Sequence, residues 1–119
     1  MVLREVCSSP GPGTTAIDWQ GTQLNLGPVH EFEASFYSAE DNMGHPALGF
    51  VVAEAQRSTF KEFTAEREGK RVALLLDGKI LTVPVINSAL QGGGVIEGPP
   101  GGFTEEEVKQ LLNEARQSN

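Results

Sequence analysis

The chain has 119 residues and a mass of 12.7 kDa, which is enough for one domain with a single hydrophobic core. Hydrophobic residues make up 39% and charged residues 21%, which is typical of a folded domain and not of a disordered chain. The 14 glycines and 7 prolines predict short elements and many turns, and they exclude a bundle of long helices. The formal net charge is −7, and no Lys or Arg occurs between Arg4 and Arg57. Such a surface repels phosphate, so nucleic acid and anionic membranes are disfavoured as partners.

No segment has the features of a membrane span or a targeting signal. The longest uncharged run, residues 80–96, contains Pro84 and three consecutive glycines, so we expect no membrane insertion by this chain. The first seven residues lack the apolar core of a signal peptide. We therefore expect either a cytoplasmic location or a leader or membrane segment outside this chain. The single cysteine, Cys7, has no partner for a disulfide or a paired-thiol zinc site.

The N-terminal part of the chain predicts strands joined by turns. Residues 2–7 alternate weakly between apolar and polar side chains and predict a strand. A Ser/Pro/Gly loop follows. Residues 17–19 and 22–26 flank Gln20-Gly21, which predicts a short hairpin.

The middle of the chain predicts a second hairpin and then a helix. Residues 29–39 fit a helical face and a half-buried strand equally well. We interpret them as a strand, because turn residues follow and lead into an apolar partner at residues 47–52. Beyond that partner the spacing becomes helical, with Phe60 and Phe63 on one face and Gly69 as a predicted stop.

The clearest local signal is a hairpin at Asp77-Gly78. Within residues 71–83, two apolar runs flank this dipeptide, which tolerates positive φ at both positions of a type I′ turn. Pro84 has no N–H and cannot donate a hydrogen bond to a neighbouring strand. The side of the strand that its nitrogen faces is therefore expected at a sheet edge or a bulge. Glycines at positions 92–94 then lead into a predicted short strand at residues 95–97.

The last helix is also well specified. Thr104 is predicted as its N-cap, and Glu107 three residues later completes a capping box. Phe103 and Val108 occupy the two positions of a hydrophobic staple. The buried face of this helix is predicted to consist of Val108, Leu111, Leu112 and Ala115.

Together these elements predict an α+β domain. We expect a mainly antiparallel sheet of about six short strands, with two helices packed on one face. Residues 47–77 are interpreted as one strand–helix–strand crossover, expected to be right-handed. Residues 1–119 are interpreted as a single domain, in which residues 1–31 are N-terminal strands and loops.

Motifs for catalysis or cofactor binding are weak. Gly69-Lys70 is followed by arginine where a phosphate-binding loop needs Ser or Thr, and it ends a predicted helix. His30 lies beside Glu31 and Glu33, and His45 lies in a Gly-His-Pro turn. Without a fixed spacing we interpret both histidines as solvated side chains, and a metal-dependent enzyme would need them to meet carboxylates in one pocket. The sequence therefore predicts no enzyme, no cofactor and no metal site.

An ordered series of motifs runs through the chain beyond residue 32. Its clearest parts are GKRVALLLDGK at residues 69–79 and PVI at residues 84–86, with a later Phe-Thr-x-x-Glu. This series resembles the head subdomain of the first extracytoplasmic domain (the P1 head) of the bacterial SecD/SecDF protein-export family. We therefore interpret residues 32–119 as a SecD-head-like region. The matching positions are Gly69, Lys70, Leu76, Asp77, Gly78, Pro84, Gly92, Gly93, Gly98, Phe103, Thr104 and Glu107.

The resemblance implies a function as well as a fold. In that family the head is not an enzyme, and it belongs to a proton-driven membrane device that assists polypeptides leaving the Sec channel. It implies unfolded polypeptide or translocase components as partners, and a location that is extracytoplasmic or membrane-attached in the bacterial envelope. The family's proton-coupling residues lie in membrane helices, so none carries over to this chain. Residues 98–102 look like an insertion relative to the family pattern.

One segment is a candidate for binding polypeptide by strand addition at an exposed sheet edge. The alternative is that Pro84 and the glycines only blunt an edge against aggregation. An alternative of a different class is a structural domain that self-associates through a sheet face and has no link to export. The oligomeric state is left open. The candidate edge residues are Val83, Pro84, Val85, Val95 and Ile96.

Overall fold

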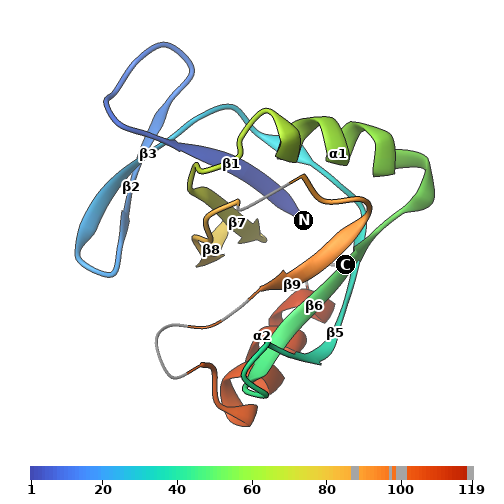
Figure 1. Ribbon diagram of the computed structural model, residues 1–119. Helices are drawn as coiled ribbons and strands as arrows, with labels where there is room; N and C mark the ends of the chain where they lie inside the picture. Colours follow the sequence, from blue (N-terminus) through green and yellow to red (C-terminus); the bar gives the residue numbers. More distant parts are fainter. Residues whose placement is uncertain (87–88, 97, 99–101, 118–119) are drawn as a thin grey trace.

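The computed structural model describes residues 1–86, 89–96, 98 and 102–117. Within these residues the chain forms two antiparallel sheets and two α-helices, which confirms the predicted α+β class (Figure 1). The strands are β1 (Val2–Cys7), β2 (Thr15–Trp19), β3 (Thr22–Leu26), β4 (His30–Glu31), β5 (Ala34–Glu40), β6 (Pro46–Val52), β7 (Val72–Leu76), β8 (Lys79–Thr82) and β9 (Gly93–Ile96). The helices are a 3₁₀ turn, η1 (Glu54–Gln56), and the α-helices α1 (Arg57–Ala65) and α2 (Glu105–Gln117).

The larger sheet is organised around β1 and β7. Its strand order is β2-β3-β1-β7-β8, and β4 also pairs with β1. Residues 2–5 of β1 pair with β7, whereas Val6 and Cys7 pair with the end of β3. The N-terminal strand therefore joins the first hairpin to the middle of the domain.

Every residue of β7 is buried, because both faces of this strand are covered. Alternate side chains of a strand point to opposite faces. One set lies in the main core together with Phe60 and Phe63 of α1. The other set packs with residues of β3 in a smaller core, which consists of Leu24, Leu26, Ala73 and Leu75.

Both predicted two-residue hairpin turns are confirmed. Asp77 and Gly78 have φ angles of 52° and 77° and join β7 to β8. Gln20 and Gly21 have φ angles of 51° and 79° and join β2 to β3. Positive φ at both central residues is the property of a type I′ turn.

The smaller sheet has the order β5-β6-β9. β5 and β6 pair along their full lengths, which confirms the strand interpretation for residues 34–39 of the ambiguous segment. Residues 30–31 of that segment instead form β4, which pairs with β1 in the larger sheet. β9 pairs with the middle of β6, with Gly49 opposite Val95 and Val51 opposite Gly93. Glycine is required at position 93, because a Cβ there would overlap the carbonyl oxygen of Phe50.

The two helices contribute to one main core. Phe32 contacts the rings of Phe60 and Phe63 of α1 edge-on, with centroids 5.3 and 5.8 Å apart. Gly69, the predicted stop, lies four residues beyond the end of α1 with a φ of 81°. The predicted capping box of α2 is confirmed. The Glu107 N–H donates to Thr104 Oγ1 at 3.1 Å, and the Thr104 N–H donates to Glu107 Oε1 at 3.0 Å.

The division of the strands differs from the predicted single sheet. β6 belongs to the smaller sheet and β7 to the larger one, so the unit over residues 47–77 is not a crossover within one sheet. The physical reason is that β1 and β8 occupy both edges of β7, which leaves no edge for β6. The helices likewise do not share one face of a single sheet, because the main core contains residues of both sheets. Residue 97 of the predicted strand and residues 99–101 of the predicted insertion lie outside the described residues.

Candidate functional site

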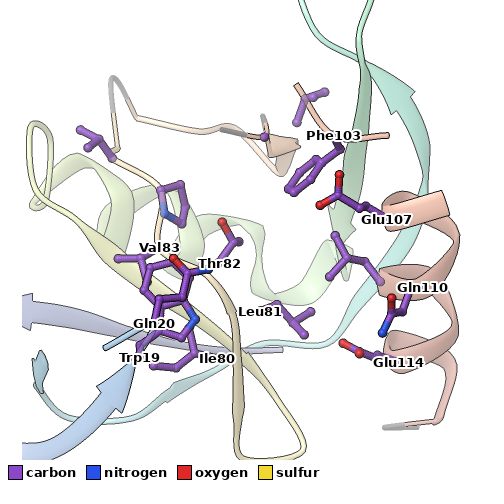
Figure 2. A pocket seen from close by; sticks show the side chains of 15 residues that line it. Trp19, Gln20, Ile80, Leu81, Thr82, Val83, Phe103, Glu107, Gln110 and Glu114 are labelled. Atoms are coloured by element: carbon purple, nitrogen blue, oxygen red, sulfur yellow. The ribbon is translucent and has the colours of Figure 1, made fainter. Parts of the chain in front are cut away.

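A cavity of about 770 Å³ lies between the β8 side of the larger sheet and α2 (Figure 2). We call it the cleft. Four parts of the chain line it: the end of β2 with its turn, β8 with the segment after it, β9, and one side of α2 with Phe103 before it. The cleft therefore brings together residues from β2, near the start of the chain, and from α2, the last element of the fold.

One wall of the cleft is apolar. Trp19, Ile80 and Val83 lie together on it (Figure 2). The same three side chains pack against the smaller core, which supports them from behind. Trp19 reaches this wall because it is the last residue of β2, directly before the hairpin turn.

The opposite wall is one side of α2. Glu107, Gln110, Leu111 and Glu114 fall at positions i, i+3, i+4 and i+7, so they share one side of the helix. Figure 2 shows the two glutamates and the glutamine along this wall, with Phe103 ahead of them. Among the described lining residues there is no Lys or Arg, so the charged groups in the cleft are carboxylates.

In the segment after β8, the N–H and C=O groups of Val85 point away from the neighbouring strand. The Val72 N–H donates to the Pro84 carbonyl at 2.9 Å, and the Ile86 N–H donates to the Lys70 carbonyl at 2.9 Å. Val85 lies between these two bonds. In an antiparallel ladder such a residue has its own N–H and C=O turned away from the partner strand. Because β8 ends the strand order, the backbone groups of Val85 point to the outer edge of the larger sheet.

β9 presents an equivalent residue at the edge of the smaller sheet. The Val52 N–H donates to the Gly92 carbonyl at 2.8 Å, so these two residues form a hydrogen-bonded pair. Along the antiparallel ladder between β6 and β9, hydrogen-bonded pairs alternate with pairs that are not hydrogen-bonded. Val95, opposite Gly49, then falls at a position whose N–H and C=O point away from β6. Val85 and Val95 are 49% and 45% exposed, and both line the cleft. Each sheet therefore contributes an edge residue to the same cavity.

Most of the predicted edge residues meet in the cleft, but they do not form one continuous edge. Val83, Pro84 and Val85 come from the larger sheet, and Val95 comes from the smaller one. Ile96 does not reach the cleft, because it alternates with Val95 and its side chain is 4% exposed in the main core.

The motif positions divide into structural and cleft residues. Pro84, Gly98, Phe103 and Glu107 line the cleft. Leu76 is buried in the main core. Lys70 lies outside the cleft lining, with its Nζ 3.7 Å from Glu5 Oε2. Most of the family motif therefore builds the fold around the cleft.

Sequence reasoning missed part of the lining. The regular spacing of Gln110, Leu111 and Glu114 was a usable signal for the α2 wall. Trp19 had no local signal, because its place depends on how the first hairpin packs over β7.

The two histidines lie apart from the cleft and have local partners. The His30 ring lies 4.7 Å from the Phe63 ring, and burial together with the nearby Arg67 charge lowers the pKa of His30. The Nδ1 atom of His45 lies 3.2 Å from Asp41 Oδ2. Within the described part of the chain, no three His, Cys, Asp or Glu side chains are grouped to hold a metal ion.

The SecDF P1 head subdomain family matches residues 29–117 of the chain. The chain belongs to this family. The predicted resemblance is thereby confirmed, and it covers every element from β4 to α2. In the described residues of this P1 head, no helix is long and apolar enough to cross a membrane.

The P1 head is similar to part of several protein translocase subunits. It is 37% identical to SecD of Aquifex aeolicus over 75 residues, which cover 63% of this chain and 14% of that protein. It is 37% identical to SecD of Leptotrichia buccalis over 93 residues, covering 75% of this chain and 22% of that protein. It is 41% identical to SecDF of Thermus thermophilus over 59 residues, covering 49% of this chain and 8% of that protein. The P1 head thus spans less than a quarter of these relatives.

Two solved SecDF structures share the fold. One is of a membrane component SecDF that enhances protein export, with a TM-score of 0.60, 26% identity and coverage of 95% of this chain and 62% of that one. The other is of SecDF in a super-membrane-facing form, with a TM-score of 0.61, 26% identity and coverage of 95% and 18%. Because this coverage exceeds residues 29–117, the structural likeness extends into the N-terminal strands.

Proposed function

We propose that this P1 head is a non-enzymatic module that binds extended polypeptide and assists Sec-dependent protein export. The observation that carries the proposal is the cleft, into which each sheet contributes an edge residue with outward backbone groups, Val85 and Val95. The similarity to translocase subunits supports the link to export. Because the relatives are much longer, the proposal assigns this chain only a binding step, on the extracytoplasmic side of the membrane.

The binding mode we propose is strand addition. An extended polypeptide has unpaired N–H and C=O groups, and these complement the groups that Val85 and Val95 present. Main-chain hydrogen bonds do not depend on side-chain identity, so this mode suits a protein that meets many different unfolded chains. The apolar wall at Trp19, Ile80 and Val83 then receives alternate side chains of the polypeptide.

A titration followed by NMR tests this function. A disulfide-free, unfolded polypeptide is added to the ¹⁵N-labelled protein, and the amide shifts are recorded. We expect shift changes concentrated in residues 80–98 and at Trp19. An absence of changes there at high micromolar polypeptide would contradict the proposal.

Two variants separate strand addition from side-chain contact. Val85→Pro and Val95→Pro each remove an outward-pointing N–H without removing an observed ladder bond, so we expect weaker binding with little loss of stability. Val85→Ala is the matched control, because it trims the side chain and keeps the N–H. Thermal unfolding verifies that each variant is folded. Equal binding by the proline variants and the wild type would rule out strand addition.

A further inference from the structure

We propose that β5 is a second edge for strand addition, on the opposite side of the smaller sheet from the cleft. The inference rests on the proposed function for its class of partner, extended polypeptide, and adds a separate site. The strand order β5-β6-β9 places β9 at the cleft and β5 at the other edge (Figure 1). Among the described strands, none pairs with the outer edge of β5.

The hydrogen bonds at the two ends of β5 show which of its backbone groups face outward. Before the strand, the Ala53 N–H donates to the Glu33 carbonyl at 2.9 Å. After it, the Asp41 N–H donates to the His45 carbonyl at 2.9 Å. Hydrogen-bonded residues alternate along an antiparallel ladder, so the odd-numbered residues of β5 turn their N–H and C=O groups toward β6. The residues whose N–H and C=O groups point outward are then Ala34, Phe36, Ser38 and Glu40.

β5 lacks the features that usually protect an edge strand from pairing. Natural edge strands are commonly very short, bulged, or interrupted by proline or lysine. β5 has seven residues without Pro or Lys, it pairs with β6 in a continuous register, and its one charged residue, Glu40, is the last. This edge therefore offers a run of outward-facing backbone groups, whereas each sheet contributes one such residue to the cleft.

The side chains around β5 leave its outer edge open. Gly49 of β6 lies opposite Tyr37, and a Cβ at this glycine would overlap the Tyr37 ring. The ring therefore lies back over β6 and not along the outer edge. A cavity of about 790 Å³ lies at the start of the strand, and its lining includes Ala34, Ser35 and the 41% exposed side chain of Val51. An added strand can thus place a side chain in this cavity while its backbone pairs with β5.

The charges around β5 favour a foreign polypeptide over a second copy of this chain. Glu33 directly precedes the strand, and Glu40 ends it. Antiparallel pairing of two β5 strands would bring the start of each beside the end of the other, so these carboxylates would meet like charge. No Lys or Arg occurs between Arg4 and Arg57, so neither β5 nor its neighbours in sequence supply a compensating charge. The occupant we assign is therefore an extended segment of an unfolded polypeptide.

An NMR titration with a short peptide tests the second edge. The peptide has about seven alternating Val and Thr residues, the length of β5, and a Lys at each end. We expect its binding to shift the amides of Phe36, Ser38 and Glu40 and to slow their hydrogen exchange about tenfold or more. The amides of Ser35 and Tyr37, which face β6, should stay protected with and without the peptide.

Ser38→Pro is the decisive variant. The side chain of Ser38 is exposed and its N–H points outward, so proline removes a donor without removing a ladder bond to β6. We expect affinity at the β5 edge to fall about three- to tenfold, as for the loss of one hydrogen bond. Ser38→Ala is the matched control, because it keeps the N–H and should bind like the wild type. Thermal unfolding verifies that both variants are folded.

The outcomes separate this inference from the proposed function. Changes at residues 80–98 and Trp19 without changes along β5 would overturn the second edge while binding in the cleft stands. Changes along β5 alone would support the second edge and contradict binding in the cleft. Equal binding at β5 by the wild type and Ser38→Pro would overturn the inference, since main-chain pairing would not be responsible. A wild-type dimer in sedimentation that Ser38→Pro dissociates would also overturn it, because a second copy would then be the occupant.

Discussion

Single residues at the hairpin turns position the apolar wall of the cleft. Asp77 and Gly78 adopt the positive φ angles that bring β8 back against β7, and Ile80 reaches the cleft as a result. This turn was predictable because the Asp-Gly signal is contained in two adjacent residues. The position of Trp19 was not predictable, because its hairpin is held in place by contacts between residues that are far apart in the sequence. The Arg4 Nε donates to the Gly27 carbonyl at 2.6 Å, and no local pattern encodes that contact.

At the residue scale we predict that Gly78→Ala destabilises the fold. The φ of Gly78 is 77°, a region where a side chain costs about 1 kcal/mol or more, although no residue beyond its two chain neighbours lies within 4 Å of the added Cβ. Gly11→Ala is the matched control, because its Cβ also meets open space but its φ is not positive. Urea unfolding should show the loss in the free energy of unfolding for Gly78→Ala alone. Equal effects of the two substitutions would contradict the turn argument.

Whole elements were predicted well where local signals agreed. The α2 start was set by a capping box, and the β5–β6 hairpin was set by alternation and turn residues. β4 has two residues and no pattern of its own, so only its pairing with β1 defines it. The candidate edge was predicted as one element because Val85 and Val95 are close in sequence, yet they belong to different sheets.

At the element scale we predict that Thr104→Ala weakens both α2 and the cleft. The substitution removes the acceptor of the Glu107 N–H, and loss of an N-cap costs about 1 kcal/mol. Thr104→Ser keeps the hydroxyl and should retain most of the stability. Chemical denaturation gives the free energy of unfolding of both variants. If Thr104→Ser were as destabilised as Thr104→Ala, the loss would come from packing and not from the cap.

In the folded molecule, the edges of the two sheets meet at one cavity. The smaller sheet and the larger one share a main core, and the cleft opens where β8, β9 and α2 border it. Local patterns could not predict this arrangement, because it depends on β1 pairing with β7 about 70 residues later. The likeness to a SecDF structure over 95% of the chain shows that the two proteins share this fold.

At the scale of the molecule, amide hydrogen exchange with and without bound unfolded polypeptide is the most direct test of the central claim. The amides of Val85 and Val95 point away from their partner strands, so we predict that both exchange fast in the free protein. Bound polypeptide should slow both amides by about tenfold or more, while the Val72 and Val52 amides, which already donate within the fold, stay protected throughout. Fast exchange at Val85 and Val95 under saturating polypeptide would contradict strand addition in the cleft.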